Sequence, residues 1–216
     1  MSVLRVAVLV SGGGTNLQAL LDAAAAGDLP ARIVRVVSDR RSAVALERAR
    51  GAGVPTRVVR PRDFAERAGF DAALAAALAE SGADLVVHAG FMRIVGPAYL
   101  AAWSGRCVNV HPSLLPAFPG LDAPRQALEY GVRYSGCTVH FVDEGVDTGP
   151  VILQEPVPVH PDDTPETLHR RIQQAEWRLL PAAVRLIAQG RLRLEGRRVH
   201  ILPPTETGED VGCQGR

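Results

Sequence analysis

The start of the chain alternates between an unbroken apolar run and a helix-forming stretch. Residues Leu4–Val10 are nearly all β-prone, and the run stops at three consecutive glycines, residues 12–14. Residues 16–26 then have the alanine and leucine content of a helix. Apolar runs without polar alternation indicate strands buried on both faces, as in a parallel sheet covered by helices. We therefore expect a doubly wound, Rossmann-like α/β fold with right-handed crossovers.

The same alternation continues through the first half of the sequence and changes character after residue 107. Further strands are expected at residues 33–37, 56–59 and 85–89, with helices at residues 43–50 and 72–80. The second part predicts strands at residues 107–111, 137–142 and 151–157, a short helix near residues 125–130, and antiparallel pairing. Thr164 as N-cap and Pro165 as the first helical residue predict a long final helix. The sheet is thus expected to be mostly parallel, with an antiparallel C-terminal extension.

The length and polarity of the chain indicate one domain. We expect that domain to cover residues 1–202, because the core-forming pattern continues that far. Residues 203–216 are polar and rich in Gly, Pro and Glu, which predicts a loose tail.

Composition excludes several classes of function. The formal net charge is +1, from 24 basic and 23 acidic residues, which argues against binding to nucleic acid or to an anionic membrane. Every basic residue is arginine, so neither a lysine Schiff base nor a Walker lysine is available. The three cysteines lack metal-ligand spacing, and no apolar run approaches about 20 residues. We expect a cytoplasmic protein without a metal.

The glycine run after the first predicted strand is a candidate phosphate site. Consecutive glycines let backbone N–H groups approach an anion, and the N-terminus of the next helix adds a positive dipole. Thr15 and Asn16 are placed to add side-chain hydrogen bonds. The run is neither a GxGxxG motif, because Leu17 takes the last glycine position, nor a P-loop. A purely structural turn stays open as an alternative, as does a dinucleotide site using Asp39.

Asn109, His111 and Asp147 are the candidate catalytic residues. Asn109 and His111 lie two apart near the end of a predicted strand, so their side chains face the same side. Ligands of open α/β sheets bind at such carboxyl ends of strands. Asp147 lies in a loop dense in carboxylates, and a carboxylate near an imidazole favours the imidazolium. Strand-end hydrogen bonding and ordinary Asp-Thr-Gly turn chemistry are the alternatives.

Two further features have both a functional and a structural interpretation. Glu176 lies at the border of the apolar stripe of the last helix, where it either reaches a ligand or forms a solvated flank. The apolar stretch of residues 90–94 follows a strand, so it either lines a pocket for a flat ligand or belongs to the core.

Four segments occur in order along the chain and carry a family resemblance. They are residues 11–18 (SGGGTNLQ), 89–95 (AGFMRIV), 108–116 (VNVHPSLLP) and 147–150 (DTGP). With these motifs the chain closely resembles the phosphoribosylglycinamide formyltransferases, which are folate-dependent enzymes of de novo purine biosynthesis. The likeness extends from about residue 4 to about residue 194. It implies the formyltransferase fold.

The resemblance implies a role for each matching residue. Asn109 and His111 would hold the formyl oxygen and supply a proton, and Asp147 would raise the pKa of the histidine. The acceptor substrate, glycinamide ribonucleotide, would contact Gly14, Thr15, Asn16 and Glu176. The co-substrate, 10-formyltetrahydrofolate, would contact Arg67, Met92, Arg93, Ile94, Val95, Asn109, Asp143, Glu144, Gly145, Val146 and Asp147. The implied partners are small molecules, and a homodimer stays open.

One departure and three rival functions accompany the resemblance. Residues 121–125 (LDAPR) stand where many family members carry histidines, which affects the expected substrate-side wall. A deformylase would use water as acceptor and a related enzyme would use charged methionyl-tRNA. Both usually carry an additional domain for which 216 residues leave no room. A noncatalytic phosphate-binding module would use the glycine loop alone.

Overall fold

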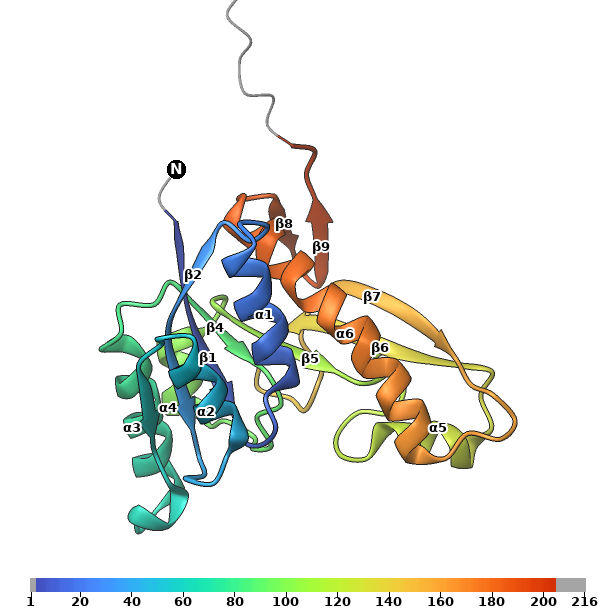
Figure 1. Ribbon diagram of the computed structural model, residues 1–216, viewed down its shortest axis with the longest axis horizontal. Helices are drawn as coiled ribbons and strands as arrows, with labels where there is room; N and C mark the ends of the chain where they lie inside the picture. The colour runs from blue at the N-terminus through green and yellow to red at the C-terminus, as the bar shows by residue number, and fades with distance from the viewer. Residues whose placement is uncertain (1–2, 205–216) are drawn as a thin grey trace, which may run out of the picture.

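A seven-stranded sheet forms the centre of the computed structural model, which describes residues 3–204 (Figure 1). Its strands run in the order β3-β2-β1-β4-β5-β6-β7. The first five are parallel, whereas β6 and β7 are antiparallel to their neighbours. The strands are β1 (Leu4–Val10), β2 (Ala31–Ser38), β3 (Thr56–Val58), β4 (Leu85–His88), β5 (Cys107–His111), β6 (Tyr134–Phe141) and β7 (Val151–Pro158). The predicted α/β fold with an antiparallel extension is confirmed.

Helices cover both faces of this sheet. The helices are α1 (Thr15–Ala25), α2 (Val44–Gly51), α3 (Arg67–Ala79), α4 (Pro97–Trp103), α5 (Ala123–Tyr130) and α6 (Pro165–Ala188), with a short 3-10 turn at Pro61–Asp63. Val6 and Val8 of β1 pack in a core with α1, α2 and α6. Ala7 and Leu9 face the other way, into a core with α3 and α4. Because β1 is buried on both faces, its sequence is apolar without alternation.

The predicted start of the last helix is confirmed. The Thr164 hydroxyl accepts a hydrogen bond from the Thr167 backbone N–H at 3.3 Å, and the Thr167 hydroxyl accepts one from the Thr164 N–H at 2.9 Å. This reciprocal capping satisfies two donors that a helix start leaves free, and Pro165 needs no partner there. The helix packs across α1 and β6 (Figure 1), so it joins the two halves of the sheet on one face.

Strand β5 is the junction between the parallel and the antiparallel parts. Its residue Asn109 pairs with His88 of β4 and with His140 of β6, whereas His111 pairs with Thr138 of β6. Paired residues on adjacent strands point to the same face, so His88, Asn109 and His140 form a row across three strands. This row lies at the carboxyl end of the parallel strands.

Several elements differ from the expectations. Helix α4 was not predicted, and its Tyr99, Leu100 and Trp103 are buried against the α3 side of the sheet. A separate hairpin of β8 (Leu192–Glu195) and β9 (Arg198–Ile201) also escaped prediction. Of the predicted tail, residues 205–216 lie outside the described residues.

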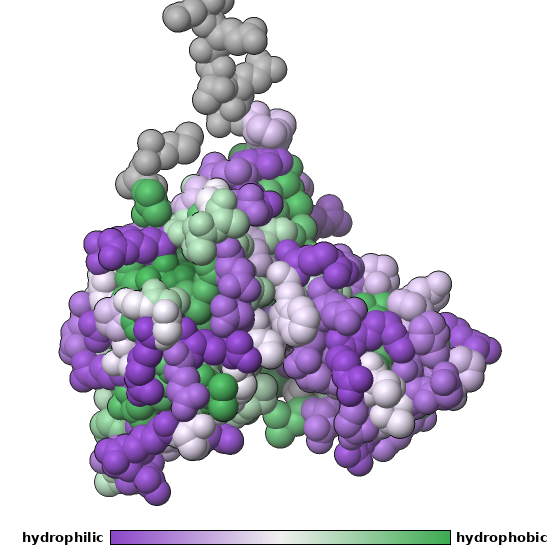
Figure 2. All heavy atoms as spheres, viewed as in Figure 1, coloured by the Kyte–Doolittle hydropathy of each residue, from purple (hydrophilic) through white to green (hydrophobic). Residues whose placement is uncertain are grey.

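The outer surface is mixed in character. Hydrophilic residues cover most of the face seen in Figure 2, and hydrophobic residues appear there as smaller areas between them. Among residues 3–204, none of the helices has both the length and the apolar character needed to cross a lipid bilayer.

Candidate active site

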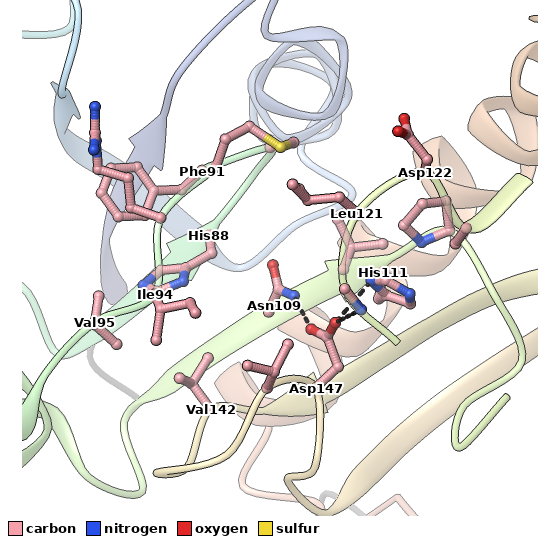
Figure 3. A pocket seen from close by; sticks show the side chains of 18 of the residues that line it. His88, Phe91, Ile94, Val95, Asn109, His111, Leu121, Asp122, Val142 and Asp147 are labelled. Carbon is pink, nitrogen blue, oxygen red and sulfur yellow. Dashed lines mark hydrogen bonds and ion pairs between the residues drawn. The ribbon is translucent and has the colours of Figure 1, made fainter. Parts of the chain in front are cut away.

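A cavity of about 1130 Å³ opens where β4 and β5 end (Figure 3). Its walls come from the ends of these strands, from the loops that follow β4, β5 and β6, from residues 61–70, and from the first turns of α5 and α6. Many of the predicted site residues line it: Arg67, Met92, Arg93, Ile94, Val95, Asn109, His111, Asp143, Gly145, Val146 and Asp147. The structure thus brings together residues spread over about 80 positions, at the edge where open α/β sheets bind ligands.

Large apolar side chains stand exposed on the walls of this cavity. Met92, Ile94, Leu121 and Val146 all line it, and their exposed fractions are 57%, 59%, 72% and 44%. Exposed apolar groups gathered around one opening mark a binding surface, since covering them with a ligand removes apolar area from water. A flat, largely apolar ligand would fit these walls.

Asp147 is the centre of the polar cluster on the cavity floor. Its Oδ2 accepts a hydrogen bond from the Gly120 N–H at 2.8 Å and lies 3.2 Å from Nδ1 of His111. Its Oδ1 accepts a bond from Nδ2 of Asn109 at 3.4 Å. Figure 3 shows Asn109 and His111 on either side of the Asp147 carboxylate, with dashed lines to it. Asp147 has a φ of 55°, a left-handed conformation that aspartate tolerates better than most residues. In this backbone conformation the Asp147 carboxylate points toward the His111 ring.

Both ring nitrogens of His111 face acceptors. Nδ1 faces the Asp147 carboxylate, and Nε2 lies 2.8 Å from the Phe118 carbonyl oxygen. A neutral imidazole can donate to only one of them, whereas the imidazolium donates to both. Burial lowers the pKa of His111 below its ordinary value, and the Asp147 carboxylate and the Phe118 carbonyl oppose that shift. Burial outweighs these two opposing contacts, so the pKa of His111 stays below its ordinary value.

Asp147 stays ionised in this environment. Burial acts to raise its pKa, but His140, the Gly120 N–H and His111 together outweigh that effect, and the pKa lies below its usual value. A permanent negative charge therefore faces the imidazole.

Two buried carboxylates hold the arginines on the opposite wall. Arg93 donates from Nε to Oδ2 of Asp39 at 2.5 Å, and the Asp39 side chain is fully buried. Arg67 donates to the Ile94 carbonyl at 2.8 Å, with its Nε 3.6 Å from Asp71. Asp39, which the sequence left open as a ribose-binding residue, is thus paired with Arg93 in this chain.

The glycine loop lies beside this cavity rather than in its lining. Gly14 has a φ of 72°, and a Cβ built on it would lie 2.5 Å from Cβ of Ala45, so only glycine fits. The carbonyls of Gly12 and Gly13 accept hydrogen bonds from the Ala45 N–H and from Arg48. A Cβ built on Gly12 or Gly13 would meet no atom within 4 Å, so the space beside these two glycines is open.

Helix α1 begins at Thr15 without a side-chain cap. Uncapped N–H groups at an open helix start are what an anion needs.

Residues 4–184 of this chain match the model of the formyl transferase family. The chain belongs to the formyl transferase family. It is 51% identical over 203 residues to phosphoribosylglycinamide formyltransferase of Mycobacterium tuberculosis (strain ATCC 25618 / H37Rv), covering 91% of this chain and 94% of that protein. It is 48% identical over 190 residues to the trifunctional purine biosynthetic protein adenosine-3 of Bos taurus. That match covers 88% of this chain, which spans only 19% of the bovine protein.

A solved structure agrees with this assignment. The crystal structure of glycinamide ribonucleotide transformylase 1 from Symbiobacterium toebii is similar to this chain with a TM-score of 0.92 and 55% identity. The match covers 94% of this chain and 95% of that one. The family membership inferred from the four sequence motifs is confirmed.

Some predicted residues of this formyl transferase lie outside the cavity lining. They are Gly14, Thr15, Asn16, Glu144 and Glu176. Thr15 lines a second, smaller cavity of about 580 Å³ between α1 and α6. Glu144 follows Asp143 in the loop, but its side chain does not contribute to the walls.

Glu176 is buried, so its interpretation as a solvated helix flank is wrong. Its Oε2 accepts a hydrogen bond from Nδ2 of Asn16 at 2.8 Å, which ties α6 to the start of α1. Oδ1 of Asn16 is buried and has no hydrogen-bond partner among residues 3–204. Burial raises the pKa of Glu176, and the Asn16 bond opposes the rise. The pair therefore sets the position of the residue that follows the glycine loop.

Sequence reasoning missed His140. Its Nε2 lies 3.6 Å from Oδ1 of Asp147 and 3.3 Å from Nδ2 of Asn109, and its Nδ1 lies 2.8 Å from the Phe141 carbonyl oxygen. It therefore helps to orient the Asp147 carboxylate. The available signal was its position on a predicted strand in the sequence just before the carboxylate-rich loop.

The two loops of the site are joined directly. The Met92 N–H donates to the Ser11 hydroxyl at 2.9 Å, and the Ser11 N–H donates to the Gly90 carbonyl at 3.1 Å. The glycine loop and the apolar wall of the cavity therefore share hydrogen bonds. Within the described part of the chain, no cluster of three or more His, Cys, Asp or Glu residues is placed to hold a metal ion.

Proposed function

We propose that this chain transfers the formyl group of 10-formyltetrahydrofolate to the amine of glycinamide ribonucleotide, a step of de novo purine biosynthesis. The observation that carries this proposal is the cluster of Asn109, His111 and Asp147 at the floor of an apolar-walled cavity. The products are formylglycinamide ribonucleotide and tetrahydrofolate.

The cavity suits the formyl donor. Its exposed Met92, Ile94 and Val146 offer apolar contact to a flat ring system, and a volume of about 1130 Å³ exceeds the usual size of a small-molecule pocket. Arg67 lies at the rim with most of its side chain exposed, where it can meet a carboxylate of the folate tail. The loop of residues 143–147 would close the other side.

The three polar residues have distinct roles in this mechanism. As the substrate amine attacks the formyl carbon, negative charge develops on the formyl oxygen, and Asn109 and the His111 imidazolium would donate hydrogen bonds to it. His111 exchanges its bond to the Phe118 carbonyl for this oxygen. Asp147 favours the charged form of the imidazole and orients the ring, and His111 then passes its proton toward the departing folate nitrogen as the carbon–nitrogen bond breaks. The proton released from the amine restores the imidazolium.

The glycine loop suits the acceptor. The backbone N–H groups of the glycine loop, with open space beside Gly12 and Gly13, and the uncapped start of α1 would bind the phosphate of glycinamide ribonucleotide. Glu176 would contact the same substrate from α6, next to Asn16. The loop lies beside the cavity, so an acceptor held there can present its amine to a donor held in the cavity.

An assay with three acceptors tests this function. With 10-formyltetrahydrofolate present, the purified chain should form tetrahydrofolate quickly only when glycinamide ribonucleotide is added, and mass spectrometry should find the formyl group on the glycinamide nitrogen. Water alone and methionyl-tRNA are the other two acceptors. Fast formation of tetrahydrofolate without an added amine would indicate a deformylase. Formylation of methionyl-tRNA would indicate a methionyl-tRNA formyltransferase.

The remaining expectations concern location and assembly. We propose that the chain acts in the cytoplasm, as its free buried thiols Cys107 and Cys137 suggest. Light scattering of the purified chain decides whether it forms a homodimer.

A further inference from the structure

Three buried polar groups form a closed triangle at the inner end of the cavity. Nε2 of His88 lies 2.9 Å from the Tyr99 hydroxyl and 3.3 Å from Sγ of Cys107, and the hydroxyl lies 3.5 Å from the same sulfur. Tyr99 and Cys107 are completely buried and make no other side-chain hydrogen bond among residues 3–204. Neither the fold nor the proposed mechanism requires such a cluster in an apolar core.

Counting protons fixes the tautomer of His88. Burial raises the pKa of Cys107 to about 12 and that of Tyr99 well above its usual value, so the thiol and the phenol each keep a proton. If Nε2 carries no proton, the hydroxyl donates to Nε2 and the thiol donates to the hydroxyl oxygen, and every proton has an acceptor. If Nε2 carries a proton, it can no longer accept a hydrogen bond. The N–H, the hydroxyl and the thiol are then all donors, and one of their three protons has no acceptor within the triangle. The triangle therefore favours a proton on Nδ1.

Nδ1 of His88 is the ring nitrogen that is left for a ligand, because Nε2 contacts Tyr99 and Cys107. His88 lines the cavity, and within the described structure its Nδ1 has no hydrogen-bond partner. The ring is fixed by Phe91, whose centroid lies 5.4 Å away at an interplanar angle of 62°. Figure 3 shows His88 among the apolar side chains of this wall.

His88 stays neutral in this position. Burial, followed by the nearby His140, lowers the pKa of His88 to about 3. The group is therefore a neutral N–H donor with a fixed direction rather than a proton carrier.

We propose that His88 is a ligand-binding residue that donates a hydrogen bond from Nδ1 to an acceptor atom, a carbonyl oxygen or an unprotonated ring nitrogen, on the bicyclic ring of the formyl donor. This rests on the proposed function. Tyr99 and Cys107 act through His88, as positioning residues that set its tautomer. The apolar walls bind a flat ring without fixing its orientation, whereas one directional donor at the inner end selects the orientation that presents an acceptor there.

Three substitutions of His88 distinguish Nδ1, the nitrogen left for a ligand, from Nε2. In His88→Asn the amide nitrogen falls near the position of Nδ1, whereas in His88→Gln the amide reaches toward the position of Nε2. We expect His88→Leu and His88→Gln to raise the KM for 10-formyltetrahydrofolate by about tenfold, the usual effect of losing one hydrogen bond. His88→Asn should recover most of that loss. The KM for glycinamide ribonucleotide should stay the same in all three.

Nuclear magnetic resonance gives a second readout that packing alone would not move. In protein labelled with ¹⁵N-histidine, His88 should show a protonated Nδ1 and an unprotonated Nε2, and the Nδ1 signal should shift when tetrahydrofolate is added. Tyr99→Phe should leave the fold intact and increase the population of the other tautomer. A His88 with its proton on Nε2 would overturn the proposal.

The kinetic outcomes also separate this inference from the proposed function. If the parent protein fails to formylate glycinamide ribonucleotide, the proposed function is wrong. If the parent is active and His88→Leu keeps the parental KM for the folate, or if Gln rather than Asn restores it, His88 has only a structural role.

Discussion

The parallel and antiparallel parts of the sheet contribute different kinds of groups to the site. The parallel part supplies binding groups: the backbone of the glycine loop after β1 and the apolar side chains of the loop after β4. The antiparallel part supplies titratable side chains, with His140 on β6 and Asp147 in the loop between β6 and β7. His111 lies between them, at the end of β5, in register only with β6.

The difference teaches how binding and chemistry are divided in this fold. Parallel strands end at one edge, so their loops collect N–H groups and helix starts that bind ligands. A hairpin lets a carboxylate return across the sheet and meet a histidine at 3.2 Å. Substitutions in the antiparallel part and at the end of β5 should therefore change kcat, and those in the parallel part should change KM.

Loss of His111 should have the largest effect. His111→Ala removes the proposed proton donor and one proposed hydrogen bond to the developing oxyanion, so kcat should fall by about 10²- to 10⁴-fold. The KM for each substrate should change by less than about threefold, since the walls and the glycine loop are untouched. Steady-state kinetics with both substrates measure this. A large rise in either KM with unchanged kcat would break the proposed division.

Asp147→Asn should have the next largest effect. Asparagine tolerates the φ of 55° and can still accept from the Gly120 N–H, so the loop should keep its shape. Without the carboxylate the pKa of His111 falls further, because one of the groups that oppose the effect of burial is gone. We expect kcat at neutral pH to fall by about 10²-fold.

The pH profile distinguishes this effect from a change of shape. Turnover that needs the imidazolium declines as pH rises through the pKa of His111, so the alkaline limb of Asp147→Asn should move to lower pH. An unmoved limb in the folded variant would show that Asp147 does not tune the histidine.

Gly14→Ala tests the parallel part. The new methyl group would lie 2.5 Å from Cβ of Ala45, at a φ of 72° that costs an alanine about 1–2 kcal/mol. The loop must shift, so the KM for glycinamide ribonucleotide should rise by about tenfold or more, with a smaller rise for the folate. The matched variant Gly13→Ala adds a methyl group that meets no atom within 4 Å, so its thermal unfolding should resemble that of the parent. Equal rises in both KM values would indicate general misfolding.

Glu176→Gln should have the smallest effect of these substitutions. We expect it to stabilise the protein slightly. The new amide can donate to the unpartnered Oδ1 of Asn16 while its oxygen still accepts from Nδ2. The free energy of unfolding at pH 7 should rise by about 1 kcal/mol. Because the folded pKa of Glu176 is raised, its contribution in the parent is complete below the unfolded pKa and is lost as pH rises through the folded value. The gain from Gln should therefore vanish at acidic pH, as chemical denaturation at several pH values would reveal.

The sequence predicted the strands that are buried on both faces of the sheet. Strand β5 was predicted with its true bounds, and β1 was evident because both of its faces are apolar. Helix α4 was missed because its seven residues are too few to display a periodic stripe, and its sequence reads as core. The β8–β9 hairpin packs only lightly on the sheet, and its mostly exposed residues have no clear alternation of apolar and polar side chains.

The site was only partly visible in the sequence for a similar reason. Asn109, His111 and Asp147 are recognisable from motif and strand position, but the partners of Asp147 come from segments far apart in the chain. His140 and Gly120 become its neighbours only when β6 pairs with β5. The burial of Glu176 could not be predicted because it depends on the packing of α1 against α6, which helical periodicity does not contain.

The hydrogen bonds of Ser11 would couple the two proposed substrate sites thermodynamically. Ser11 belongs to the glycine loop, yet its hydroxyl and its N–H both bind the loop that forms the apolar wall. A ligand that changes the free energy of one loop conformation changes that of the other, and the resulting factor in affinity is the same in both directions. Either substrate would therefore preorganise the protein for the other, and a chain that lacks one ligand would hold the second less tightly.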